Sequence, residues 1–306
     1  MPDSIKFNFF KSHDLLKIRY AYIRTTEKNL KGIILLLHGR AEFIEKYKNI
    51  IHDLTQKGFD VATLDWRGQG LSARETMDRQ KGYVKNFNDY LKDLKLFFDQ
   101  VVKPENKKVY ILAHSMGGHI GLRFLHDYPG NIDKAVLLSP MFDIKSFFLT
   151  RFVLRSITKF ALVSGFSRNY IVGGKKYVSL KHNLKKNIFS HDPLKSDIQA
   201  HEIKKNPDLA LGGLTWAWLN AAYDSIDIIM TQEYASRIYT PVLIINAQKD
   251  MLVKKSAQKK ISSFLPLCEY LSIKNAYHEI LFEKKEIIDI FWAKFEGFIN
   301  CSQYKN

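Results

Sequence analysis

Six stretches of the chain are mainly apolar, and they recur at intervals from residue 32 to residue 273. A strand with one face in water alternates apolar and polar residues, whereas a continuous apolar run indicates a strand covered on both faces. Helix-like sequence separates the runs; residues 88–102, for example, begin with an asparagine suited to a helix N-terminus. This alternation predicts an α/β fold with a mostly parallel sheet flanked by helices. The six runs are residues 32–38, 59–66, 108–114, 134–140, 241–247 and 269–273.

Two other regions depart from this alternation. The early runs "IKFNFF" and "LKIRYAYI" predict an antiparallel hairpin at an edge of the sheet. Residues 141–226 contain only helix-like and loop-like sequence. We interpret them as a helical cap inserted over the carboxyl edge of the strands, where open α/β sheets bind ligands. The predicted organisation is therefore a core formed by residues 1–140 and 227–306, with a cap formed by residues 141–226.

The composition is that of a globular protein with an unusual charge. The 306 residues are 46% hydrophobic, which suffices for a large core, and their formal net charge is +16. Cys268 and Cys301 are too few for a disulfide framework and have no zinc-type spacing, which favours a reducing compartment and no metal site. The N-terminus lacks a signal-peptide core, and no apolar stretch is long enough to span a membrane. We therefore expect a cytoplasmic protein with an anionic partner.

The stretch "YILAHSMGGH" places Ser115 between a predicted strand and a predicted helix. This is the nucleophile-elbow pattern, in which a sharp turn holds the serine in a strained conformation that only small neighbours tolerate. Ala113, Gly117 and Gly118 are such neighbours. The serine hydroxyl then lies at a helix N-terminus, where negative charge is stabilised. The alternative is a glycine-rich turn with an incidental serine, because short motifs of this kind have false positives.

A serine nucleophile also needs a histidine base and an acid that orients this base, and in folds with this elbow they follow in the order acid, then histidine. Asp250 follows the predicted strand 241–247, and His278 follows the predicted strand 269–273. Taken singly, Asp250 is consistent with a loop-capping aspartate and His278 with a surface histidine. Their joint occurrence in the required order favours a catalytic triad. Asp224 and Asp227, near the end of the cap, are the main alternatives for the acid.

The oxyanion hole of such a site requires backbone amides. One candidate is the amide of Met116, which follows the nucleophile, and the other is the amide of Arg40, in the loop after "ILLLHG". We expect the Arg40 side chain to be incidental to that role. The stretch "DWRGQGLS" is glycine-rich but lacks the ending of a phosphate-binding loop, so we interpret it as a turn that supports the site.

Four segments resemble a known group of α/β-hydrolases, which contains the monoacylglycerol lipases and the bacterial inner-membrane lysophospholipase. The segments are "LLLHGRAEF", "DWRGQGLS", "ILAHSMGG" and "NAYHEILFE". The resemblance covers essentially the whole chain and is stronger for the lysophospholipase branch. It implies Ser115 as nucleophile, Asp250 as orienting acid and His278 as base, with the amides of Arg40 and Met116 as oxyanion donors.

The chain departs from the pattern of the group at two places. Ala113 replaces a glycine, a feature shared with the lysophospholipase branch. Arg40 and Ala41 follow "HG", where lipases usually have smaller residues. The second departure affects the entrance of the acyl pocket and hence the substrate preference.

The predicted cap is strongly basic. Between Asp143 and Asp192 the chain has no Asp or Glu but ten Lys or Arg residues. If these cations lie on an amphipathic helix, the helix favours binding to an anionic membrane surface. The alternative is a cap helix that packs its apolar side on the core and exposes its basic side to solvent. Nucleic acid is disfavoured because no binding module accompanies the charge. The cations are Lys145, Arg151, Arg155, Lys159, Arg168, Lys175, Lys176, Lys181, Lys185 and Lys186.

The resulting hypothesis is a serine esterase that cleaves the fatty-acyl ester of lysophospholipids through an acyl-enzyme, with no metal or cofactor. A monoacylglycerol lipase or a general carboxylesterase is the alternative enzyme. A lipid-binding protein on a hydrolase scaffold is the alternative from another class. We expect the protein to lie peripherally on the inner face of the cell membrane. Headgroup preference, acyl-chain preference and oligomeric state stay open.

Overall fold

The computed structural model describes residues 5–146, 149–178 and 188–302. A central sheet of eight strands has the order β1-β2-β4-β3-β5-β6-β7-β8. Strands β3 to β8 run parallel to one another, whereas β1 and β2 form an antiparallel hairpin at one edge, as the sequence predicts, and β2 pairs antiparallel with β4. The strands are β1 (Phe7–Lys11), β2 (Lys17–Ile23), β3 (Gly32–Leu37), β4 (Phe59–Leu64), β5 (Val109–His114), β6 (Lys134–Leu138), β7 (Val242–Ala247) and β8 (Cys268–Ile273).

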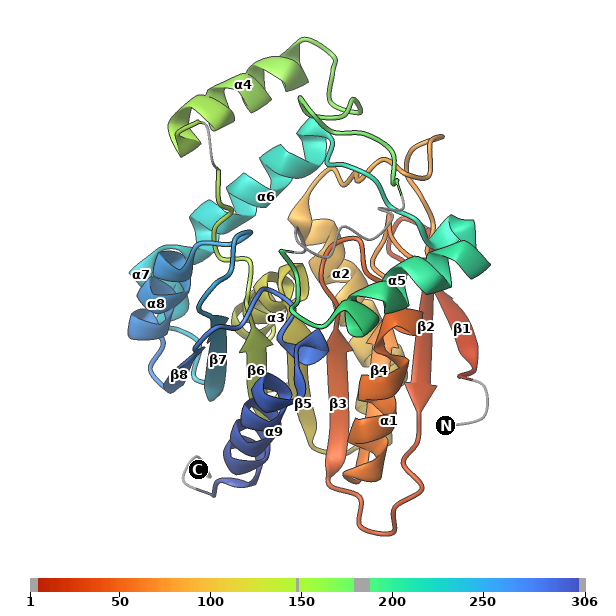
Figure 1. Ribbon diagram of the computed structural model, residues 1–306, viewed down its shortest axis with the longest axis vertical. Coiled ribbons are helices and arrows are strands. Elements are labelled where there is room, and N and C mark those ends of the chain that lie inside the picture. Colours follow the sequence, from red (N-terminus) through yellow and green to blue (C-terminus); the bar gives the residue numbers. More distant parts are fainter. Residues whose placement is uncertain (1–4, 147–148, 179–187, 303–306) are drawn as a thin grey trace.

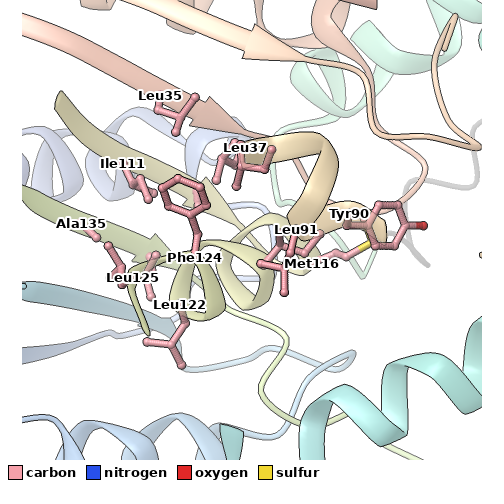
Figure 2. Packing of buried hydrophobic residues seen from close by; sticks show 14 of the residues in the cluster. Leu35, Leu37, Tyr90, Leu91, Ile111, Met116, Leu122, Phe124, Leu125 and Ala135 are labelled. Carbon is pink, nitrogen blue, oxygen red and sulfur yellow. The ribbon is translucent and has the colours of Figure 1, made fainter. Parts of the chain in front are cut away.

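Helices cover both faces of this sheet, which explains why its central strands are apolar throughout. Along β3, Ile33, Leu35 and Leu37 belong to one buried cluster, and Ile34 and Leu36 belong to the other. Helices α2 (Phe87–Phe97), α3 (Met116–Asp127) and α8 (Lys255–Phe264) supply the first cluster, part of which is drawn in Figure 2. Helices α1 (Lys48–Gln56) and α9 (Lys285–Asn300) supply the second and lie together on one face in Figure 1. The predicted α/β fold is therefore confirmed.

Helix α2 begins at Phe87, one residue before the predicted stretch 88–102. The side chain of Asn86, rather than that of Asn88, caps it by accepting a hydrogen bond from the Asn88 amide at 2.9 Å. The helix then widens into a π-turn at Phe98–Val102 before it ends. An asparagine at either position fits the sequence pattern, and the extended backbone of Asn86 decides which one is the cap.

Helices of residues 141–226 lie beyond the carboxyl ends of the parallel strands (Figure 1). They are α4 (Arg151–Val163), α5 (Pro193–Lys205) and α6 (Trp216–Ile229), and the short α7 (Gln232–Ala235) follows. Helix α6 lies between α4 and the sheet in Figure 1. We keep the division into 1–140, 141–226 and 227–306 as a proposal, and note that α6 runs across its second boundary. Within the described ranges, no helix is both long and apolar enough to cross a membrane.

The orientation of α4 differs from both sequence-based expectations. Its cations do not form a free basic face: Arg155 pairs with Asp224 at 2.7 Å and Asp227 at 3.1 Å, both on α6. Arg151 pairs with Asp227 as well and lies 3.5 Å from Asp143. The lack of acids within the segment was therefore misleading, because acids from a later helix pack against it.

The outward side of α4 is largely apolar instead. Phe152 is 81% exposed, Phe160 73% and Val163 90%, while Thr158 and Ala161 face the protein and are buried. Three of the predicted cap cations, Lys181, Lys185 and Lys186, lie outside the described residues, as does Phe148.

Candidate active site

Ser115 occupies the sharp turn between β5 and α3. Its φ of 51° and ψ of −114° are strained for a residue with a side chain, as the elbow pattern predicts. Small neighbours make the turn possible: a Cβ on Gly117 would lie 2.3 Å from the Leu37 carbonyl oxygen, and one on Gly118 would lie 2.8 Å from Pro140. The close approach of α3 to β3 and to the end of β6 therefore requires these two glycines.

The fold brings Ser115, His278 and Asp250 together from three strand ends. Nε2 of His278 lies 2.9 Å from Oγ of Ser115, and Nδ1 of His278 lies 2.6 Å from Oδ2 of Asp250. All three side chains are buried. With Nδ1 donating to the carboxylate, Nε2 is left as the acceptor that faces the serine hydroxyl.

Asp250 is held as a carboxylate. Burial would raise its pKa, but His278 and two backbone amides outweigh this effect, and the pKa is lowered. The amides are those of Leu252 and Val253, which donate to Oδ1 at 2.7 and 3.1 Å. The carboxylate is thus both ionised and fixed in orientation.

Asp224 and Asp227 do not contribute to this arrangement. Both are about half exposed on α6, where they pair with Arg151 and Arg155 of α4. Asp224 and Asp227 therefore connect two cap helices, α4 and α6, through ion pairs.

The loop after β3 presents the amide of Arg40. On either side, Gly39 donates to Glu42 at 2.5 Å and Ala41 donates to Gln69 at 2.7 Å. Within the described part of the chain, no hydrogen bond takes up the Arg40 amide. Met116 is the first residue of α3, so its amide is one of those that have no acceptor within the helix.

Gln69 connects these two positions. Its Oε1 accepts from Ala41, next to Arg40, and its Nε2 donates to Sδ of Met116 at 3.6 Å. Figure 2 shows Met116 beside Tyr90 of α2 at the edge of the buried cluster. The turn that contains Gln69, within "DWRGQGLS", thus supports the site, as expected from its sequence.

A buried cluster of charged residues behind the site has no counterpart in the sequence-based expectations. Glu42 accepts from Lys46 and Tyr47, each at 2.7 Å, and faces Nδ1 of His114 at 3.2 Å. Lys46 also donates to Glu279, the residue after His278, at 2.8 Å. Burial would raise the pKa of Glu42, but Lys46 and His114 hold it well below the usual range. The only sequence signal was Glu42 itself, three residues after Gly39.

Among the residues with described coordinates, no group of three or more His, Cys, Asp or Glu side chains is placed to hold a metal ion.

The eight-stranded sheet with its nucleophile elbow and the Ser–His–Asp hydrogen bonds together define a serine hydrolase of the α/β-hydrolase fold. The model of the family "serine aminopeptidase, S33" matches residues 28–285. The chain belongs to this family of α/β-hydrolases.

Two curated relatives match over most of the chain. It is 30% identical over 300 residues to lysophospholipase L2 of Escherichia coli (strain K12), which covers 95% of this chain and 86% of that one. It is 29% identical over 275 residues to the probable lysophospholipase L2 of Haemophilus influenzae, which covers 89% of this chain and 85% of the relative.

Solved structures show the same fold. A soluble variant of the monoglyceride lipase from Saccharomyces cerevisiae has a TM-score of 0.78 at 17% identity, covering 98% of this chain and 96% of that one. A thermostable carboxyl esterase from Bacillus coagulans has a TM-score of 0.77 at 18% identity, covering 97% and 98%.

Proposed function

We propose that this protein hydrolyses the fatty-acyl ester of lysophospholipids, with Ser115 as nucleophile, His278 as base and Asp250 as orienting acid. The observation that carries the proposal is the continuous pair of hydrogen bonds from Asp250 through His278 to Ser115. A serine hydroxyl is a weak nucleophile, and a base at 2.9 Å with a fixed tautomer is what activates it. The substrate class comes from the relatives named lysophospholipase L2.

The reaction proceeds in two steps. Oγ of Ser115 attacks the acyl carbonyl carbon while Nε2 of His278 takes the hydroxyl proton, and the same nitrogen then protonates the leaving glycerol oxygen. A water molecule, deprotonated by His278, attacks the acyl-enzyme and releases the fatty acid. Asp250 stays ionised and stabilises the imidazolium that forms in each step, in keeping with its lowered pKa.

The amides of Arg40 and Met116 are the proposed oxyanion donors. The Met116 amide lies at the N-terminus of α3, where the helix offers it no acceptor. The Arg40 amide has no acceptor within the described ranges and lies between two amides that donate to side chains. Removal of one such donor typically lowers kcat by about 10²- to 10³-fold, so both positions are important to the rate.

Two alternatives to this proposal differ in their support. A monoacylglycerol lipase or general carboxylesterase is favoured by the fold shared with a monoglyceride lipase and a carboxyl esterase. A lipid-binding protein on a hydrolase scaffold is disfavoured by the complete Ser–His–Asp arrangement.

One panel separates these alternatives. The purified protein is given a lysophospholipid, a monoacylglycerol with the same acyl chain and a short p-nitrophenyl ester, and is also treated with a fluorophosphonate serine probe. We expect labelling of Ser115 and a higher kcat/KM for the lysophospholipid than for the monoacylglycerol. Labelling with the reverse preference would favour the lipase, and an unlabelled, inactive protein would favour the lipid-binding alternative.

We further propose that α4 docks the protein on a membrane surface, peripherally on the inner face of the cell membrane. The support differs from that given by the sequence, because two of the helix cations are engaged with α6. The exposed apolar side chains Phe152 and Phe160 suit insertion at the lipid boundary. Lys159, for which the described residues provide no ion pair, lies on the same helix and suits an anionic headgroup.

A shallow hollow of about 340 Å³ lies on α4. Cationic and aromatic side chains line it together, namely Arg151, Phe152, Arg155, Ser156 and Lys159. Such a mixture suits the boundary between headgroups and acyl chains.

A further inference from the structure

The side chain of Arg40 has no acidic partner in the part of the chain that the structure describes. Its Nη2 donates to the carbonyl oxygen of Gly212 at 2.6 Å, and its guanidinium carbon lies 5.5 Å from the Trp218 ring centroid. Its Nε is buried without a hydrogen-bond partner. No carboxylate among the described residues lies within ion-pair distance, and burial lowers the pKa of the guanidinium to about 10. Arg40 is therefore a partly buried cation whose buried Nε leaves donor capacity unused.

Two buried arginines of this chain, Arg19 and Arg67, are paired with acids. Arg19 binds Asp65 and Glu45, each at 2.7 Å, and Arg67 binds Asp93 at 2.7 Å. The partly buried Arg74 has no carboxylate partner among the described residues; its Nε and Nη2 donate to two carbonyl oxygens within its own loop, and its Nη1 is left without a partner there. Burial of an unpaired charge is costly, so the position of Arg40 is best explained by an anion that arrives with the substrate.

Tyr170 provides a second unused donor in the same place. Its hydroxyl oxygen is buried, with no hydrogen-bond partner among the described residues. The charge of Arg40 opposes the rise in the Tyr170 pKa that burial produces, and Tyr170 in turn affects Arg40, so the two groups lie close enough to interact. Tyr170 is held there because its backbone bridges to that of Thr215, the residue that caps α6. Two donors without partners among the described residues, from two different segments, thus lie against the same stretch of chain, because Arg40 contacts Gly212 and Tyr170 bridges to Thr215.

We propose that Arg40 and Tyr170 bind the phosphate group of the lysophospholipid headgroup. This inference rests on the proposed function and deepens it. The Arg40 amide is a proposed oxyanion donor, so the Arg40 side chain begins next to the scissile ester. In a lysophospholipid the phosphate is likewise a short distance from this ester. The guanidinium fork suits phosphate oxygens, and a phenol supplies a further donor. A monoacylglycerol has no anion to offer.

The carboxylate of the fatty-acid product is a less suitable ligand. On release it lies at Ser115, between the amides of Arg40 and Met116, whereas the guanidinium is directed towards Gly212 and Trp218. The phosphate lies on the leaving-group side of the ester, away from the product carboxylate. It is therefore the anion that the Arg40 guanidinium is placed to bind.

The test compares kcat/KM for a 1-acyl-lysophospholipid and for the monoacylglycerol with the same acyl chain, in the full chain. Any damage to the oxyanion loop lowers both values and cancels in their ratio. We expect Arg40→Met to lower the ratio of lysophospholipid to monoacylglycerol by about 10- to 100-fold, as for loss of a charged hydrogen bond, and Tyr170→Phe by a smaller factor. Arg74→Met, which removes another partly buried arginine, is the control and should leave the ratio unchanged.

A second arm uses sn-glycerol 3-phosphate and inorganic phosphate as inhibitors of p-nitrophenyl ester turnover. We expect glycerol phosphate to inhibit the wild type competitively and Arg40→Met at least tenfold more weakly. Stronger inhibition by inorganic phosphate would assign the site to free phosphate and overturn the headgroup assignment. An unchanged ratio in Arg40→Met, or equal inhibition of wild type and variant, would overturn the phosphate site itself. A wild type that prefers monoacylglycerol, yet shows Arg40-dependent inhibition, would contradict the proposed function and not the phosphate site.

Discussion

The ring of His114 lies 4.8 Å from that of His278, and its Nε2 faces the His278 carbonyl oxygen at 3.3 Å. Its Nδ1 faces Glu42 at 3.2 Å, so both nitrogens have acceptors and the ring suits the doubly protonated form. Burial would lower the pKa of His114, but Glu42 prevails and raises it. His114, which precedes the proposed nucleophile, thus holds the loop of the proposed base, and Glu42 holds His114.

Ser115→Ala should abolish ester hydrolysis and leave the fold intact, because only a small hydroxyl is lost. His278→Ala should have nearly the same effect, and the double variant should be scarcely worse, since the residues act as a unit. The measurement is kcat on a p-nitrophenyl ester, with circular dichroism to check the fold. Retention of more than a few per cent of the activity by Ser115→Ala would contradict the assignment.

Asp250→Asn should fold but lose about 10⁴-fold in kcat, because the amide no longer enforces the tautomer of His278. Asp224→Asn serves as the control, since Asp224 pairs with Arg155 on the cap and not with the histidine. If Asp224→Asn were the inactive variant and Asp250→Asn active, the acid would have to be reassigned.

Glu42→Gln should reduce both stability and activity. The amide cannot satisfy Lys46, Tyr47 and the Gly39 amide together, and loss of one partner of a buried ion pair costs about 3–5 kcal/mol. Urea unfolding measures the first effect and ester turnover the second. Glu105→Gln, which breaks an ion pair with the exposed Arg24, should change the free energy of unfolding by no more than about 1 kcal/mol. Equal effects of the two substitutions would exclude a special role for the buried cluster.

Stability should fall with acidification partly through His119. This ring is buried between the Met141 carbonyl oxygen and the Ser225 hydroxyl, and burial lowers its pKa to about 3. In the unfolded chain the pKa is about 6.5, so between these values the unfolded state binds the extra proton and is favoured. The free energy of unfolding should therefore decrease by up to about 1.4 kcal/mol per pH unit from this group as the pH falls from about 6.5 towards 3.

His119→Gln should reduce the pH dependence of the free energy of unfolding between pH 6 and pH 4, by an amount that corresponds to the uptake of about one proton on unfolding. The measurement is urea unfolding at a series of pH values, with the slope of the variant subtracted from that of the wild type. Parallel curves would show that His119 titrates alike in the folded and unfolded chain.

Phe152→Ser together with Phe160→Ser should weaken binding to anionic vesicles while sparing turnover of a soluble ester, because both side chains are exposed and lie outside the proposed triad. Vesicle flotation at low and high salt measures the electrostatic and apolar parts separately. Tyr239→Ser, which removes an exposed aromatic residue outside α4, is the matched control. Unchanged binding by the double variant would exclude α4 as the docking element.

Loss of the ion pairs between α4 and α6 should have a different effect. Arg155→Gln leaves Asp224 without its partner, so α4 should become more accessible to proteolysis, even though the exposed apolar side is unchanged. Limited proteolysis followed by mass analysis measures this accessibility. The control is Arg237→Gln, which breaks an exposed ion pair with Glu233, four residues earlier in the chain.

The sequence by itself determined the sheet and the order of the proposed site residues. Continuous apolar runs encode strands covered on both faces, and the small residues around Ser115 encode a turn that larger side chains would block. Both are local properties, since periodicity and side-chain size act over a few neighbouring residues. The tertiary structure alone decided which distant charges meet. Arg155 and Asp224 are 69 residues apart, and Lys46 and Glu279 are 233 apart. No local pattern specifies such partners. The sequence therefore predicted neither the acidic partners of the cap cations nor the charged cluster behind His278. Which side of α4 faces outward follows from the same cause, because the acids of α6 draw the arginines inward and leave Phe152 and Phe160 in solvent.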